Sequence, residues 1–181
     1  YVEVSTGILK EVFDTAHGST GVAPASVKKV EALISQVIAF VSDTDSLQGL
    51  ADLIGHDYDT HAHSLKVAWL IAVFINANRD LFPDLPATDF KSFLIQATVA
   101  GLLHDIGKIK VPDNVLNKKD RLNNLEYITV QSHTAYSVSL LYESGLPRFA
   151  MQAILYHHEN EDGSGYPCGL TGNQTPLLAK I

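Results

Sequence analysis

Residues 26–41 read SVKKVEALISQVIAFV, and this stretch decides the fold class. Its apolar positions follow one another at alternating intervals of three and four residues: Val27, Val30, Ile34, Val37 and Val41. This spacing predicts a helix with one buried face, and Ser26 is a suitable N-cap for it. We interpret the apolar stripe as part of a core, the alternative being a helix that binds a partner or a second copy.

The same helical period continues on the C-terminal side of this stretch. We expect helices over residues 59–78, from 88 or 89 to 104, over 124–143 and from Pro147 to about 159. Loops are expected around Pro83 and Pro86 and around Gly107 and Pro112. Residues 161–176 hold four Gly and two Pro, which excludes regular structure there. Because no segment alternates like a strand, the predicted fold class is all-α.

Composition narrows the range of partners. The 181 residues are enough for one globular domain, and 13 Lys and Arg against 20 Asp and Glu give a net charge of −7. Such a surface does not attract a polyanion, so we expect no DNA partner.

The single cysteine, Cys168, excludes a disulfide framework and indicates a reducing, cytoplasmic compartment. The most apolar run covers only residues 67–77, against about twenty residues for a membrane span, so we expect no membrane segment.

Eight histidines are many for this chain, and several of them form clusters. His104 and Asp105 are adjacent where a predicted helix ends, and His157 and His158 form a pair at the end of another. His133 lies on the apolar side of its predicted helix. Imidazole and carboxylate groups bind Zn, Mn or Fe, and one carboxylate can bridge two ions. A metal site with several ions explains the set better than isolated core histidines do.

Three segments resemble the HD-GYP family, a branch of the HD metal-dependent phosphohydrolases that cleaves cyclic di-GMP. They are THAHSLKVA (residues 60–68), HDIGKIKVPD (104–113) and HHENEDGSGYPCGLTGNQTPLLAKI (157–181). Leu116, Lys118, Leu122 and Glu126 between them also follow the family's order. The resemblance spans about residues 57–181. It implies an HD-type helical bundle with a GYP loop, and we assign residues 23–181 to this domain. Residues 1–22 are interpreted from their own apolar residues as a connecting helix or the remnant of an upstream region.

The resemblance also implies roles for particular residues. Asp105 matches the carboxylate that bridges two metals, and Lys108 matches the lysine that approaches the scissile phosphate. The histidines that match metal ligands are His63 and His104 for the first ion and His133, His157 and His158 for the second. The family's substrate and partner loop is matched by Gly165, Tyr166 and Pro167.

Some of these assignments have alternatives. His61 competes with His63, because residues two apart on a helix face opposite sides, and the T-x-x-H-S spacing favours His63. His17, His56 and His61 are expected at the surface. Asp59 either holds a third metal, as in similar family members, or caps the helix that follows. For the GYP residues, the alternative is ordinary turn formation.

The sequence departs from the family pattern in two respects. Thr134 and Ser137 stand where the family has Pro and Gly, and the added bulk at Ser137 could alter helix packing or the shape of the pocket. The family's further aspartate ligand would lie shortly beyond Ile181, so we expect the HD-GYP domain to be C-terminally incomplete.

The function implied by the resemblance is hydrolysis of c-di-GMP to pGpG or GMP in bacterial second-messenger signalling. Two ions about 3.5–4 Å apart would lower the pKa of a water molecule, and Lys108 would neutralise charge on the phosphoryl oxygens. Two divalent ions are expected, or three if Asp59 holds one; Fe or Mn is favoured, and Zn, Ni and Co are also compatible. The alternatives are a hydrolase for another cyclic dinucleotide, and an inactive module that binds c-di-GMP or a GGDEF-domain partner through the GYP loop.

Overall fold

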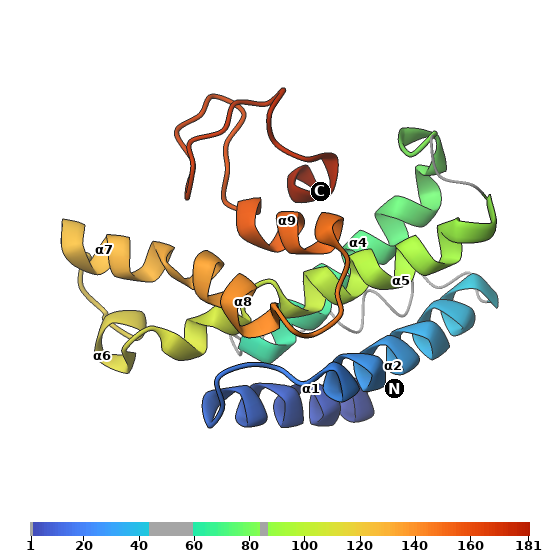
Figure 1. Cartoon of the computed structure of the whole chain (residues 1–181), viewed down its shortest axis with the longest axis horizontal. Helices are drawn as coiled ribbons and strands as arrows, with labels where there is room; N and C mark the ends of the chain where they lie inside the picture. The colour runs from blue at the N-terminus through green and yellow to red at the C-terminus, as the bar shows by residue number, and fades with distance from the viewer. Residues whose placement is uncertain (1, 44–59, 84–86) are drawn as a thin grey trace.

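The computed structural model describes residues 2–43, 60–83 and 87–181, and in these ranges it holds helices and one isolated β-bridge but no strand (Figure 1). The α-helices are α1 (Val2–His17), α2 (Pro24–Asp43), α4 (Thr60–Ala77), α5 (Ala87–Leu103), α6 (Asp113–Leu116), α7 (Asn124–Gln131), α8 (His133–Leu141) and α9 (Arg148–Tyr156). Short 3₁₀ helices are η1 (Arg79–Leu81), η2 (Ile106–Lys110) and η3 (Leu177–Lys180). The predicted all-α class is confirmed.

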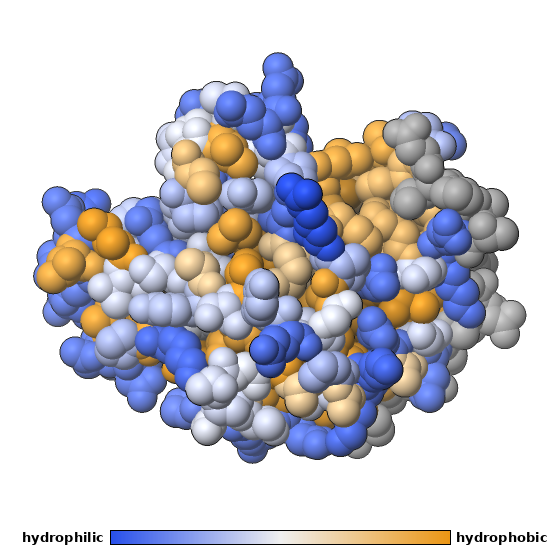
Figure 2. All heavy atoms as spheres, viewed as in Figure 1, coloured by the Kyte–Doolittle hydropathy of each residue, from blue (hydrophilic) through white to orange (hydrophobic). Residues whose placement is uncertain are grey.

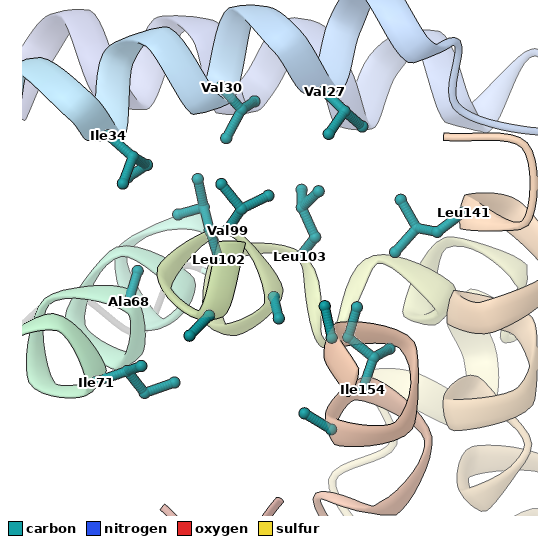
Figure 3. Close-up of a cluster of buried hydrophobic side chains, with 14 of the residues drawn as sticks. Val27, Val30, Ile34, Ala68, Ile71, Val99, Leu102, Leu103, Leu141 and Ile154 are labelled. Carbon is teal, nitrogen blue, oxygen red and sulfur yellow. The ribbon is translucent and has the colours of Figure 1, made fainter. Parts of the chain in front are cut away.

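Helix α5 is the centre of the molecule, because it packs against α2, α4 and α9 (Figures 1 and 3). Its last turns are fully buried: Val99 and Leu103 expose none of their surface, and Leu102 exposes 1%. Burying a side chain of this size contributes roughly 1.5–3 kcal/mol. The C-terminal end of α5 is therefore a firm support for whatever follows Leu103.

The apolar stripe of α2 faces this core. Val27, Val30 and Ile34 are buried and point toward Val99 and the residues after it (Figure 3). The interpretation of the stripe as core is confirmed for these three positions. With Ser26 as N-cap the helix would begin at Val27, and this was wrong by three residues, because α2 begins at Pro24, a residue suited to the first turn of a helix.

Helix α1 joins the same core. Leu9, Val12, Phe13 and Ala16 are buried in one cluster with residues of α2 and α4. The expected helix within residues 1–22 is present as α1, and the proposed domain boundary at residue 22 stays a prediction.

A single helix over residues 124–143 was expected, and this was wrong: the segment is divided at Ser132 into α7 and α8. The Ser132 hydroxyl donates to the Ile128 carbonyl at 3.0 Å, and the His133 Nδ1 lies 2.7 Å from the Val130 carbonyl. The Ile128 carbonyl also accepts the helical bond from the Ser132 amide at 3.1 Å, so the hydroxyl is a second donor there, whereas the Val130 carbonyl faces the His133 ring. Side-chain bonds of this kind locally bend or interrupt a helix.

Large apolar side chains are exposed in a few areas of the surface. On the face in Figure 2, hydrophobic atoms gather at the end of the molecule where α7 lies and, over a larger area, on the opposite side near the end of α4 and the start of α5. Leu125 and Ile128 of α7 are 73% and 57% exposed. Within the residues that the structure describes, no helix has the length and apolar character needed to cross a membrane.

Candidate metal centre

Asp105 lies at the middle of the site. It follows His104 directly after α5 ends, and it begins the turn η2, so the buried end of α5 holds it inside the molecule. Only 1% of its surface is exposed. A carboxylate buried to this extent requires compensating positive charge or hydrogen bonds.

Each carboxylate oxygen of Asp105 faces a different group of side chains. Oδ2 lies 3.9 Å from His63 Nε2, 3.2 Å from His104 Nε2 and 2.6 Å from Lys108 Nζ. Oδ1 lies 3.2 Å from His133 Nε2 and 3.8 Å from His157 Nε2.

Two sets of possible metal ligands result from this arrangement. One consists of His63, His104 and Asp105, and the other consists of Asp105, His133, His157 and His158. Asp105 belongs to both sets, as a carboxylate that bridges two ions would. The clustering of histidines predicted from the sequence is thus found in space.

Three of the histidines are oriented in the same way. The Nδ1 atoms of His104, His133 and His157 lie 2.7, 2.7 and 2.8 Å from the carbonyl oxygens of Gly101, Val130 and Ile154. Each carbonyl is three residues earlier and belongs to the last turn of a helix, where carbonyls lack helical partners. Since a carbonyl only accepts, Nδ1 carries the proton, and in the neutral imidazole Nε2 presents a lone pair toward Asp105.

Neutral rings that direct their Nε2 lone pairs toward a carboxylate are arranged as ligands of a cation. Burial, with His104 and His158 nearby, lowers the pKa of His157 to about 3, and burial and His133 lower the pKa of His158 to about 4. Both rings are therefore neutral at pH 7, and partial burial and His104 lower the pKa of His63 in the same direction. Among the residues that the structure describes, the buried Asp105 Oδ1 has no hydrogen-bond partner. Lone pairs that converge on an unpartnered carboxylate oxygen fit a divalent cation between them.

Asp105 itself remains ionised. Burial alone would raise its pKa, but positive charge on the Nε2 side of His104 and His133, from a ring proton or a bound cation, and the charge of Lys108 outweigh burial and hold the pKa well below its usual value. Lys108 reaches it from η2, and 29% of the lysine side chain remains exposed. The ammonium group is therefore positioned between the buried carboxylate and solvent.

The predicted site residues that the structure describes lie close together. His63 is the most open of the predicted metal ligands, with 57% of its side chain exposed, and it comes from the first turns of α4. Asp59, proposed for a third metal, and His56 lie outside the described residues, as does the side chain of His61. His17 is exposed, as expected.

The GYP loop covers one side of the cluster. The Tyr166 ring stacks on His158 with centroids 4.6 Å apart, and the Tyr166 amide donates to the His158 carbonyl at 3.1 Å. Gly165 has no room for a side chain, since a Cβ would overlap the backbone of His158, Glu159 and Asn160. Pro167 follows through a cis peptide bond and is exposed. Burial, with Tyr127 and Asp105 nearby, raises the pKa of Tyr166, which keeps its phenol protonated.

Glu159 is a residue whose function was not predicted from the sequence. Its carboxylate accepts hydrogen bonds from the backbone amides of Cys168 at 2.7 Å and Leu170 at 2.8 Å. It thereby closes the GYP loop from the residue next to the His157–His158 pair. Its position directly after that pair was the available signal, but the backbone partners leave no pattern in the sequence.

Comparison with known proteins gives one family and several relatives. The model of the HD domain family matches residues 86–181. A cyclic di-GMP phosphodiesterase of Pseudomonas aeruginosa is 34% identical over 173 residues, which are 94% of this chain and 37% of that protein. A cyclic di-GMP phosphodiesterase of Thermotoga maritima is 32% identical over 69% of this chain and 32% of its own length. A 3′3′-cGAMP-specific phosphodiesterase of Vibrio cholerae is 39% identical over 45% of this chain and 18% of its own. The chain thus spans little more than a third of these relatives at most.

Proposed function

Because the chain belongs to the HD-domain family, with motifs and relatives that agree with its HD-GYP branch, we propose that it is a metal-dependent phosphodiesterase that hydrolyses c-di-GMP. The observation that carries the proposal is the pair of ligand sets that share Asp105. The products would be linear pGpG, or GMP after a second cleavage.

His63, His104 and Asp105 would hold one divalent ion, and Asp105, His133, His157 and His158 would hold a second. When bound, the ions would supply Lewis acidity toward the phosphoryl oxygens and lower the pKa of a water molecule. Fe or Mn suits these mixed nitrogen and oxygen ligands, and Zn, Ni and Co are compatible with them. Asp59 is proposed as a ligand for a third ion. Neutral histidines suit such a site because they leave the positive charge of the ions in place.

Lys108 would bind the scissile phosphate. Its Nζ is 2.6 Å from Asp105 Oδ2, while part of its side chain is open to solvent, so a small rotation brings the ammonium to an incoming anion. A positive charge held there would stabilise the charge that develops on the phosphoryl oxygens.

Gly165, Tyr166 and Pro167 would contribute to substrate binding from the other side. Tyr166 presents an aromatic ring and a protonated hydroxyl beside His158, and a nucleobase stacks well on such a ring. The same loop is a proposed contact for a GGDEF-domain protein, and an upstream regulatory domain is part of the proposal. We place the protein in the cytoplasm, and its lone cysteine is compatible with that reducing compartment.

The test is turnover of c-di-GMP by the full-length protein, loaded with Mn²⁺ or with Fe²⁺ under anaerobic conditions, with products separated by chromatography. Asp105→Asn keeps the shape of the side chain but removes the charge common to both ligand sets. Residues that only hydrogen-bond to metal ligands typically account for about 10- to 100-fold in metal affinity or activity. Asp105 would be a ligand itself, so we expect turnover to fall by at least about 100-fold. Asp14→Asn, the same change at an exposed position on α1, serves as the control. Full turnover by Asp105→Asn would contradict the bridging role.

A second substrate must be measured in parallel, because some relatives are named as 3′3′-cGAMP-specific. The ratio of kcat/KM for the two dinucleotides decides between them. Binding of c-di-GMP without hydrolysis by the metal-loaded protein would instead support the inactive binding module.

A further inference from the structure

Ser137 makes two hydrogen bonds that connect distant parts of the chain. It is fully buried on α8, where its hydroxyl donates to the His104 carbonyl at 2.8 Å and accepts from the Gly107 amide at 2.8 Å. These partners flank Asp105, thirty or more residues earlier in the sequence. The hydroxyl therefore satisfies one donor and one acceptor of the turn that carries the carboxylate.

The turn lies directly on the backbone of α8. A Cβ at residue 107 would overlap the carbonyl oxygen of His133 and the amide of Ser137, so only glycine permits this approach. His133 is one helical turn before Ser137 on the same helix. The contact thus joins the segment that carries His104 and Asp105 to the segment that carries His133.

We infer that Ser137 is a positioning residue for the metal centre. Its hydroxyl fixes Asp105 against His133, whose Nε2 lies 3.2 Å from Oδ1, and so sets the geometry of the second ligand set. The inference rests on the proposed function in that it requires the centre to bind metal, but it does not depend on the identity of the nucleotide. Ser137 itself touches neither the ions nor the substrate.

Removing the hydroxyl leaves two buried backbone groups without partners. In Ser137→Ala, the His104 carbonyl and the Gly107 amide lose their hydrogen bonds where water has little access, so the turn is expected to shift. Groups that orient metal ligands typically account for about 10- to 100-fold in metal affinity. We therefore expect Mn²⁺ to bind at least about tenfold more weakly to this variant.

Thr134→Val is the matched control. Thr134 is also fully buried and on α8, but its hydroxyl donates to the Gln131 carbonyl at 3.2 Å, at the end of the preceding helix, and not to the turn of Asp105. Mn²⁺ titration calorimetry of the full-length protein, stripped of metal by a chelator, should give near-native affinity for Thr134→Val and the weakened affinity for Ser137→Ala. Native affinity in Ser137→Ala, or an equal loss in both variants, would overturn the inference.

Two further measurements keep the result decisive. If circular dichroism shows that Ser137→Ala does not fold, Ser137→Cys replaces it, because a thiol is similar in shape but is a weaker donor and acceptor. Weakened Mn²⁺ binding by Ser137→Cys supports the positioning role, and native binding contradicts it. If the native protein hydrolyses neither dinucleotide, the proposed function fails, while the Mn²⁺ affinities still decide whether Ser137 positions the centre.

Discussion

In three histidines of the metal centre, the ring is oriented by a hydrogen bond of its Nδ1 atom, on the side that faces away from the ligand cluster. His104, His133 and His157 each place Nδ1 against a carbonyl three residues earlier, which leaves Nε2 as the only nitrogen available to an ion. His104 and His157 could be predicted because they lie in clusters at expected helix ends, and His133 because it lies on the apolar side of its expected helix. Their tautomers could not, because the accepting groups are backbone carbonyls that any residue supplies.

The depressed pKa of His157 predicts acid sensitivity of the folded state. Its pKa is about 3 in the folded protein and 6.5 ordinarily, so between these values the unfolded chain binds more protons. Stability therefore rises with pH in this window and falls on acidification, by about 1.4 kcal/mol per pH unit for this group. Urea unfolding at several pH values from 7 to 4.5, with a chelator present, measures the slope.

The His157→Asn variant isolates this contribution. It removes the titrating ring, so the free energy of unfolding should depend less steeply on pH below 6.5 than in the native protein. Parallel slopes for the two proteins would show that His157 does not titrate between these limits.

At the scale of single elements, the apolar period predicted which segments form helices but not where they are interrupted. At the α7–α8 break, the Val130 carbonyl faces the His133 ring and the Ile128 carbonyl takes the Ser132 hydroxyl as a second donor, and apolar spacing reports neither contact. The short turns η2 and α6 were expected only as loop. The turn η2 packs on α8, which is distant in sequence, and α6 packs on α7.

The GYP loop is an irregular element that needs a fixed anchor, and Glu159 provides it. Glu159→Gln keeps the size of the side chain but replaces one accepting oxygen by a donor, so the amide of Cys168 or Leu170 loses its partner. Hydrogen bonds to a charged group contribute about 1.5–3 kcal/mol, and we expect a KM for c-di-GMP raised by about tenfold or more. Steady-state kinetics should show a smaller change in kcat.

Glu161→Gln is the control for this loop. Its carboxylate is exposed and lies 3.6 Å from Lys180, away from the amides that Glu159 binds. The control should leave KM near the native value. Weakened Mn²⁺ binding in Glu159→Gln would mean that this residue supports the ligands and not only the loop.

At the scale of the whole molecule, the site combines segments from α4, the end of α5, the start of α8 and the end of α9. The motifs predicted these contributors, but His133 was expected inside a longer helix and not at the start of α8. The contact between Ser137 and the turn of Asp105 was not predictable, since it joins residues thirty or more positions apart through backbone atoms. The central position of α5 brings these segments together.

Whether α1 belongs to this folded unit can be tested by the stability of the whole molecule. Leu9 exposes none of its surface and packs in the common core, whereas Leu125 on α7 is 73% exposed. We expect Leu9→Ala to lower the free energy of unfolding by about 2–5 kcal/mol, because it leaves a cavity, and Leu125→Ala to change it by less than about 0.5 kcal/mol. A chain of this size loses roughly 2–4 °C of Tm per kcal/mol, so calorimetry separates the two variants. A single shifted transition in Leu9→Ala makes α1 part of the domain that carries the metal centre, whereas an unchanged main transition makes it a separate connecting helix.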